Sequence, residues 1–370
     1  MRRVGTALLA TTILAASATL AKADVKVVTS IKPIHSLVSA VMSGVGAPSL
    51  LVEGSGSPHT YSLKPSQARQ LQEADLVFWM SHDLEAFLEN SIEGIAANAT
   101  SVPLMDAHGL IKLDFREGGA FDAHAHDERD DHDDHKDHDD HGHDDHDDHK
   151  KDDHDDHKKD DHDDHGHDDH DEHKHDDHGH DDHGHDGHDD HDEHGHEGSD
   201  PHVWLDPVNA KALVHEIEEA LVEADPAHAA SYEKNAEAVM AKLDSLVMEI
   251  DAELEPVKGR GYVVFHDAYQ YFENRFGLSA VGSVTVSPEV LPGAERVREL
   301  QKKVRDLNAT CVFSEPQFEP KLVATITENT SAGTGVLDPL GASIDDGPDL
   351  YFTLIRNMAR SLKECLQSAG

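Results

Sequence analysis

The sequence predicts an α/β protein with two lobes, each a parallel sheet flanked by helices, joined by one long rigid helix. Short apolar runs typical of buried strands alternate with segments of helical periodicity, in two separate series. A segment rich in histidine and aspartate, residues 122–197, interrupts the first series and holds only two apolar residues. Such a segment builds no core. We therefore expect a first lobe over residues 24–225 with a disordered insertion at 122–197, a connecting helix at 226–256 and a second lobe at 257–370.

Local patterns indicate each element of the first lobe. Strands are predicted at Val25–Thr29, Ser49–Val52 and Leu76–Trp79. Apolar residues recur with helical spacing over Ile34–Met42, and Pro65 can begin a short second helix. Between them, Glu53–Tyr61 is a turn-rich loop of Gly, Ser and Pro. After the insertion, Asp206 is the expected N-cap of a helix that begins at Pro207.

The connecting helix is predicted from about Ala227 to Leu254, because apolar residues recur there at three- and four-residue steps. At 1.5 Å per residue this helix is about 42 Å long, which is enough to join two lobes. Beyond it we predict strands at Tyr262–Phe265, Cys311–Ser314 and Gly335–Leu337, and helices at Ala294–Leu307 and Lys321–Thr327. Parallel sheets bind ligands just beyond the carboxyl ends of their strands. His266 and Asp338 lie at two such ends.

The first 23 residues have the pattern of a signal peptide. Arg2 and Arg3 precede the apolar run Val4–Leu20, and Ala21–Ala23 is a small-residue cleavage site. We expect cleavage before Asp24, and hence an exported protein. No other apolar run approaches the roughly 20 residues needed to cross a bilayer. No membrane insertion of its own is therefore expected.

Charge restricts the partners of this chain. The formal net charge is −44, and residues 122–197 alone hold 36 acidic residues, seven basic residues and 25 histidines. A chain this negative repels phosphate and has no basic stripe, which argues against nucleic-acid binding. Its expected partners are cations.

Two cysteines, Cys311 and Cys365, occur in the whole chain. Two cysteines in an exported protein favour a disulfide over a redox or metal pair. The alternative is two buried free thiols.

Histidine is the most informative residue outside the insertion, because imidazole is a preferred zinc ligand. Only eight histidines occur there, namely His35, His59, His82, His108, His202, His215, His228 and His266. His215 and His228 are expected at helix surfaces and His108 in a turn. His59, His202 and His266 come from separate loops and strand ends, as a site formed by folding requires. Spacing alone does not separate these three from His35 or His82.

A resemblance separates them. The stretches that carry it are Ser30–Val38, Pro58–Ser66 (beginning Pro-His-Thr-Tyr), Ala74–Trp79, Asp200–Pro207 (Asp-Pro-His-Val-Trp-Leu-Asp-Pro), Val264–Phe272 (beginning Val-Phe-His-Asp-Ala) and Val336–Gly341. Together they resemble the periplasmic zinc-binding proteins of high-affinity zinc ABC importers, the ZnuA-type members of the cluster A-I metal solute-binding proteins. The match covers nearly the whole mature chain in order, including the long helix, the two late cysteines and the His-rich insertion.

The resemblance implies a metal site and partners. It makes His59, His202 and His266 ligands of Zn²⁺, with Asp338 or water as the fourth. Some zinc-importer members carry a glutamate directly before the first histidine, but here that position is Pro58, which has no ligating side chain. The histidine at position 266 favours zinc over manganese, which prefers carboxylates, carbonyls and water. The implied partners are an ABC permease and its ATPase, the implied location is the periplasm, and we expect a monomer.

The His/Asp-rich segment is a second, separate constellation. Neutral imidazoles at two- and three-residue spacing can share a divalent ion, so several weak sites are expected. The histidines placed in them are His124, His126, His141, His143, His165, His167, His178, His180, His183, His185, His194 and His196. Imidazoles bind metal only when deprotonated, so loading should fade as pH falls through about 6.5. The alternative is an acidic solvating tract that tolerates histidine.

Three classes of function fit these observations. The first is a solute receptor that binds one zinc ion between its lobes and delivers it to a membrane permease, with the insertion collecting or sensing zinc. The second is a zinc hydrolase, but the chain has no His-Glu-x-x-His motif and no glutamate visibly placed as a general base. The third is a periplasmic metal buffer or storage protein that acts mainly through the His-rich tract. The receptor is the prediction, and no enzymatic activity is expected.

Overall fold

The computed structural model describes residues 25–116, 121, 198–285, 293–306, 309–318 and 320–368. The predicted signal peptide and the twelve tract histidines lie outside the described residues. The chain divides into a unit of residues 1–125 and 196–370 and a second unit of residues 126–195. All described residues belong to the first unit.

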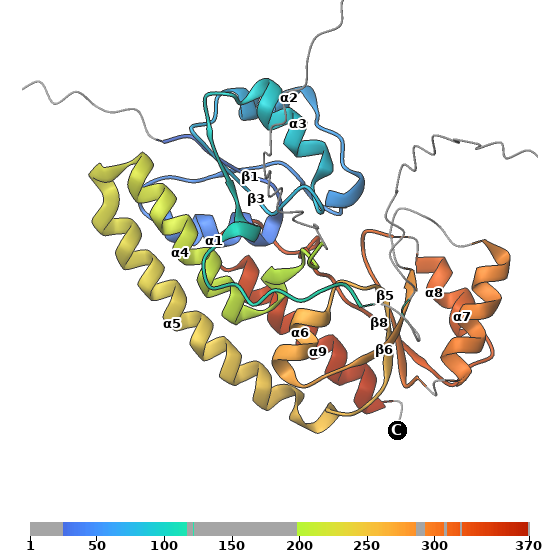
Figure 1. Ribbon diagram of the computed structural model, residues 1–370. Helices are drawn as coiled ribbons and strands as arrows, with labels where there is room; N and C mark the ends of the chain where they lie inside the picture. The colour runs from blue at the N-terminus through green and yellow to red at the C-terminus, as the bar shows by residue number, and fades with distance from the viewer. Residues whose placement is uncertain are drawn as a thin grey trace, which may run out of the picture. The chain divides into compact units, whose positions relative to one another are not determined.

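The first sheet has four parallel strands in the order β2-β1-β3-β4 (Figure 1). Its strands are β1 (Val27–Thr29), β2 (Ser49–Leu50), β3 (Leu76–Trp79) and β4 (Thr100–Pro103). The helices of this part are α1 (Lys32–Val41), α2 (Pro65–Gln72), α3 (Ala86–Ile95) and α4 (Pro207–Ala224). As predicted, Asp206 caps α4, because its side chain accepts a hydrogen bond from the N–H of Val208 at 2.8 Å and Pro207 is the first helical residue.

The second sheet also has four parallel strands, in the order β6-β5-β7-β8. Its strands are β5 (Tyr262–His266), β6 (Ala280–Thr285), β7 (Cys311–Ser314) and β8 (Gly333–Val336). Its helices are α6 (Gln270–Phe276), α7 (Ala294–Asp306), α8 (Pro320–Thr327) and α9 (Leu350–Ser368). The predicted α/β class with two parallel sheets is therefore confirmed.

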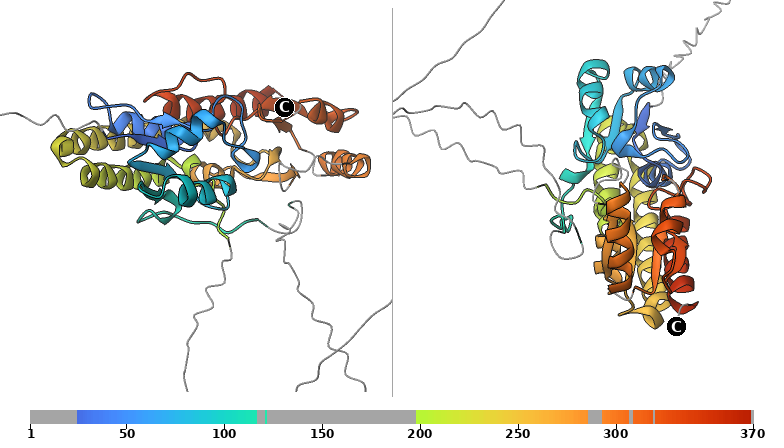
Figure 2. Two further views of the ribbon diagram at one scale, coloured as in Figure 1. Left: turned by 90° about the horizontal axis from the view of Figure 1, so that it is seen from above. Right: turned by 90° about the vertical axis from the view of Figure 1, so that its right-hand side faces the viewer.

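Helix α5 (Ala229–Leu254) follows α4 and leads to β5, so it joins the two sheets. It lies beside α4 (Figure 1, Figure 2) and also packs against α1 and α9. Its apolar residues at three- and four-residue steps are buried in one hydrophobic cluster that includes residues of both sheets. No helix of the described part of the chain is long and apolar enough to span a bilayer.

The predicted disulfide is present between Cys311 and Cys365, whose Cα atoms are 6.2 Å apart. Cys311 begins the central strand β7 and Cys365 lies in α9, and both residues are buried. The bond therefore fastens the C-terminal helix to the sheet that it covers.

Among the described residues, five strands and α-helices have no counterpart among the predicted ones: β4, α3, α6, β6 and α9. Strand β4 shows why, since Thr100 and Ser101 are exposed at the edge of the sheet and only Val102 is buried. Such a strand has no apolar run, and it is a strand only because β3 pairs with it. Strand β8 also begins two residues earlier than predicted, at Gly333.

Replacing Gly335 by alanine is expected to lower the free energy of unfolding by about 1–3 kcal/mol, as overpacking of a filled core does. A Cβ atom at this position would lie 2.5 and 2.8 Å from two ring atoms of the buried Phe313 on β7. The matched control is Gly94→Ala in α3, where nothing lies within 4 Å of the added carbon. Urea denaturation of both variants tests this, and equal stability of the two would contradict it.

Candidate metal centre

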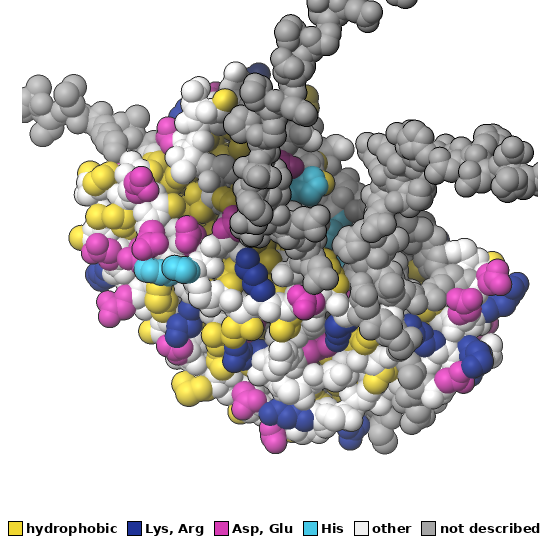
Figure 3. Space-filling view, in the orientation of Figure 1, with side chains coloured by type: hydrophobic (Ala, Val, Ile, Leu, Met, Phe, Trp, Pro, Cys, Tyr) yellow, Lys and Arg dark blue, Asp and Glu magenta, His cyan; other side chains and the backbone are white. Residues whose placement is uncertain are grey.

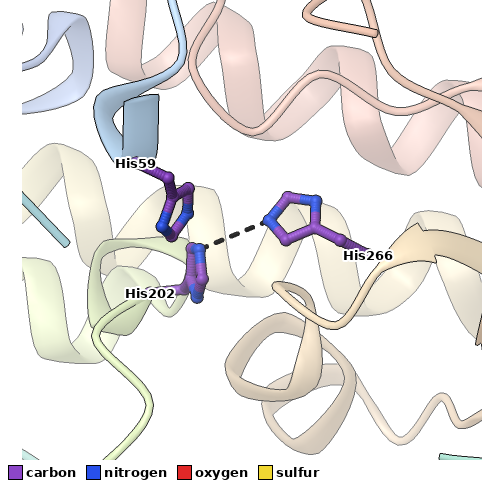
Figure 4. Close-up of side chains that lie close together, drawn as sticks. All are labelled: His59, His202 and His266. Atoms are coloured by element: carbon purple, nitrogen blue, oxygen red, sulfur yellow. Dashed lines mark hydrogen bonds between the residues drawn. The ribbon is translucent and has the colours of Figure 1, made fainter. Parts of the chain in front are cut away.

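Three histidines from three separate segments converge (Figure 4). His59 lies in the short 3-10 helix Pro58–Thr60 after β2, His202 directly precedes the 3-10 helix Val203–Leu205, and His266 is the last residue of β5. One ligating atom from each residue lies within 4.8 Å of those of the other two. The Nε2 atoms of His202 and His266 are 3.5 Å apart. These segments meet only because the chain folds.

The cavity at the three rings is small. Its lining residues are Ser57, Pro58, His59, His202, Trp204, His266, Glu315, Gln317, Phe318, Pro339 and Leu340. Its volume is about 10 Å³, which is room for about one water molecule or ion. The donor set, three imidazoles, suits a borderline metal such as zinc.

Asp200 orients the ring of His202. The Nδ1 atom of His202 lies 2.6 Å from Oδ1 of Asp200, which also accepts the backbone N–H of His202 at 3.0 Å. Because an ionised carboxylate only accepts hydrogen bonds, Nδ1 carries the proton and Nε2 is left for a metal. Asp200 is fully buried, and its Oδ2 accepts a hydrogen bond from Gln270 at 2.7 Å. The ring is thus fixed through two successive contacts.

Glu315 orients His266 in the same way. The Nδ1 atom of His266 lies 2.7 Å from Oε1 of Glu315, which is only 2% exposed. Burial lowers the pKa of His266, but the charge and hydrogen bond of Glu315, together with the charges of Asp267 and Asp200, raise that pKa above its ordinary value. His266 therefore keeps its proton to a higher pH than a free imidazole, and a metal ion must displace it.

His59 is held differently. Burial, together with the neighbouring imidazoles of His202 and His266, lowers its pKa well below the ordinary value, so the ring is neutral at pH 7. No carboxylate among the described residues bonds to the ring. Its loop is anchored by Tyr61, whose hydroxyl donates to the carbonyl of Leu51 at 3.0 Å.

Asp338 is not brought into the three-histidine group. Its Oδ1 accepts hydrogen bonds from the backbone N–H groups of Leu340 and Gly341 and from the side chain of Gln317. Its Oδ2 accepts the N–H of Ala342 at 2.6 Å. The strand end does place Asp338 near the cavity, but the turn that follows takes up both carboxylate oxygens.

The five other histidines in the described part of the chain lie outside the cavity. His35 is buried, with Nε2 3.3 Å from the carbonyl of Pro48. His82 forms an exposed ion pair with Glu89, and His108, His215 and His228 lie at the surface. Asp200 and Glu315 were not singled out from the sequence, because only the fold brings a carboxylate next to each histidine. Asp200 does lie in one of the motifs quoted above, two residues before His202.

The fold has two parallel four-stranded sheets joined by a long helix, and its three histidines surround a cavity that has room for one ion. These features are those of a metal-binding protein of the solute-binding class. The family model described as "Zinc-uptake complex component A periplasmic" (ZnuA) matches residues 27–365. The chain belongs to this family.

Named relatives agree with the family. The high-affinity zinc uptake system protein ZnuA of Brucella abortus (strain 2308) is 54% identical over 340 residues, which cover 92% of this chain and 91% of that protein. The protein of the same name from Yersinia pestis is 31% identical, over 93% of this chain and 92% of that protein. Both relatives are named as proteins of a zinc uptake system.

Solved structures share the fold. A crystal structure of ZnuA superimposes with a TM-score of 0.63 at 22% identity, covering 92% of this chain and 99% of the other. The solute-binding protein FpvC of Pseudomonas aeruginosa in complex with Mn²⁺ gives 0.65 at 16% identity, covering 94% and 100%. At such identities the likeness concerns the fold.

Replacing Glu315 by glutamine is expected to weaken zinc binding about 10- to 100-fold, the usual cost of losing the group that orients a histidine ligand. The control is Glu249→Gln, which removes an exposed carboxylate paired with Arg356. Competition for zinc with a chelator of known affinity measures both variants. Equal affinity of the two would show that Glu315 does not support the site.

Proposed function

We propose that the protein is a periplasmic solute-binding protein that captures one zinc ion and delivers it to an ABC-type permease with its ATPase. The observation that carries this proposal is the group of His59, His202 and His266 around a cavity of single-ion size. The zinc-uptake names of its relatives support the choice of zinc as cargo. The predicted signal peptide and cleavage before Asp24 support export, and we propose that the protein acts as a monomer.

The three histidines are the proposed zinc ligands, and water is the proposed fourth. Zinc takes four ligands in a tetrahedron and accepts imidazole nitrogen readily. Asp338, the other candidate for the fourth position, holds its own turn with both oxygens. Binding through Asp338 would require these backbone hydrogen bonds to break.

The same geometry argues against a hydrolase. A zinc hydrolase also needs a general base that is free to activate water beside the ion. The two buried carboxylates beside the rings, Asp200 and Glu315, are each already bonded to a histidine ring. Binding and release of the ion itself, without turnover, fit a cavity of this size.

We retain the predicted organisation as part of the proposal, with lobes at residues 24–225 and 257–370 joined by a helix at 226–256. The tract at residues 122–197 is proposed to be a low-affinity zinc collector or sensor. The described residues on either side of it are adjacent, because Asp114 and Ser199 form an antiparallel bridge. A metal buffer that acts mainly through the tract is the second candidate, supported by the 25 histidines of this segment.

A chelator-competition titration of the mature chain, residues 24–370, tests the proposal. We expect one tight zinc ion per chain, lost in the triple variant His59→Ala, His202→Ala, His266→Ala. His35→Ala is the matched control, because it removes a buried histidine that lies outside the group. A form lacking residues 122–197 should keep the tight ion, since a short turn can close the gap beside the Asp114–Ser199 bridge.

Two results would reject the receptor. If the triple variant kept the tight ion, the site would lie elsewhere in the chain. If the form without the tract lost all tight zinc binding while its circular dichroism spectrum stayed unchanged, the metal-buffer function would replace the receptor function.

A further inference from the structure

Arg116 joins the segment before the tract to the residues that follow the third histidine. Its Nε atom donates to both carboxylate oxygens of Asp267 at 3.0 Å, and Nη2 also donates to Asp267. Its Nη1 donates to Oε2 of Glu273 at 2.6 Å. Its guanidinium also lies 4.1 Å from the centre of the Phe121 ring. A planar guanidinium suits such a forked contact better than an ammonium does.

The contacts of Arg116 hold the position of His266. Asp267 directly follows His266, and the N–H of Ala268 bonds back to the carbonyl of His266 at 3.0 Å. Asp267 and Glu273 are both buried, with side chains 4% and 3% exposed. Both carboxylates bond to the one guanidinium of Arg116, whose positive charge offsets the repulsion between two buried negative groups.

The same segment also holds His202. The carbonyl of Leu113 accepts the N–H of Asp200 at 2.9 Å, and Asp114 pairs with Ser199. Gln270, at the start of α6, donates both to the carbonyl of Asp114 at 3.0 Å and to the carboxylate of Asp200 at 2.7 Å. Arg116 lies two residues after Asp114 in the chain, and from the Asp114 carbonyl hydrogen bonds lead through Gln270 to the carboxylate that orients His202.

We propose that Arg116 is a positioning residue of the metal centre, which fixes the spacing of His202 and His266 without touching the ion. It does so by holding the corner after His266 and the short bridge before His202 in one network. This inference rests on the proposed function, because it concerns the same zinc ion. Without Arg116, Asp267 and Glu273 repel each other and the two rings lose their fixed separation.

Zinc dissociation from the full mature chain tests this proposal. Each variant is loaded with one equivalent of zinc and mixed with excess chromophoric chelator, so that the slowest phase reports the tight site. We expect Arg116→Met to speed this phase about 10- to 100-fold, as loss of an outer-shell partner does. Arg116→Lys keeps the charge but loses the fork, and should give an intermediate rate. It also decides the test if the methionine variant does not fold.

The matched control is Arg275→Met. Arg275 forms a two-bond ion pair with Asp206, at 2.7 Å for each bond, between α6 and the start of α4. It is an ion pair of the same kind, but neither residue adjoins a metal-site histidine in sequence. We expect its dissociation rate to stay within about twofold of wild type, even where its melting temperature falls as far as that of Arg116→Met.

A second readout separates positioning from general stability. With one equivalent of cobalt(II), the intensity of the visible absorption reports a tetrahedral site, and it should fall in the Arg116 variants but not in Arg275→Met. Wild-type rates and spectra in folded Arg116→Lys and Arg116→Met would overturn the inference. Absence of a tight ion from the wild-type chain would instead reject the proposed function.

Discussion

Removal of the Cys311–Cys365 disulfide is expected to lower the free energy of unfolding by about 4 kcal/mol. The bond closes a loop of 54 residues in sequence separation, and a cross-link of that span removes about this much loop entropy from the unfolded chain. Because Cys311 begins β7 and Cys365 lies in α9, the unfolded chain would otherwise have to bring a central strand and the last helix together unaided.

Urea denaturation of Cys311→Ala, Cys365→Ala and the double variant measures this effect. If the bond itself is what stabilises, each single variant should lose about as much stability as the double variant, because either change breaks the bond. If the double variant instead lost as much stability as the two single variants together, the packing of each side chain would be the cause. Reduction of the wild-type protein should reproduce the loss without any substitution.

Zinc affinity is expected to fall about 10- to 100-fold between pH 7.5 and pH 5.5. A metal ion binds only neutral imidazole. Below the pKa of a ligating ring, zinc must displace the proton of that ring, and the zinc affinity therefore falls about tenfold for each pH unit. The raised pKa of His266 makes it the first ring to compete, so the fall should begin above pH 6.5. The lowered pKa of His59 keeps that ring out of the competition over this range.

Chelator competition at several pH values tests this dependence, with the chelator's own protonation taken into account and with enough chelator to empty weak sites. Glu315→Gln is the informative comparison, because it removes the carboxylate that raises the pKa of His266. Its affinity should be lower at pH 8 but should begin to fall only at lower pH. An affinity that stays constant from pH 7.5 to 5.5 would contradict the assignment of His266 as a ligand.

The charged side chains on one face of the molecule argue against nucleic acid as a partner. On the face shown in Figure 3, lysine and arginine side chains are scattered among acidic ones, without the basic stripe that a nucleic-acid surface needs. The charge of the whole chain, −44, has the same implication.

Local sequence patterns were sufficient to predict those helices and strands whose buried residues lie close together in the sequence. Strand β3 has the predicted bounds, and α5 begins two residues after the predicted start because the 3-10 helix Pro226–His228 precedes it. Strand β4 and helix α6 were not predicted, since their stability comes from neighbours distant in the chain. The pairing of Cys311 with Cys365 was predictable because an exported chain with two cysteines offers one intramolecular pair.

The sequence by itself determined the fold class and the disulfide, because both depend on residue type and local order. It separated the three histidines from the others only through the family resemblance. Tertiary structure alone decided the surroundings of those histidines. It placed Asp200 and Glu315 on the rings, turned Asp338 toward its own loop, and set Arg116 between Asp267 and Glu273. The physical reason is that a carboxylate's role depends on which donors lie within about 3 Å, and donors from distant segments reach that distance only when the chain folds.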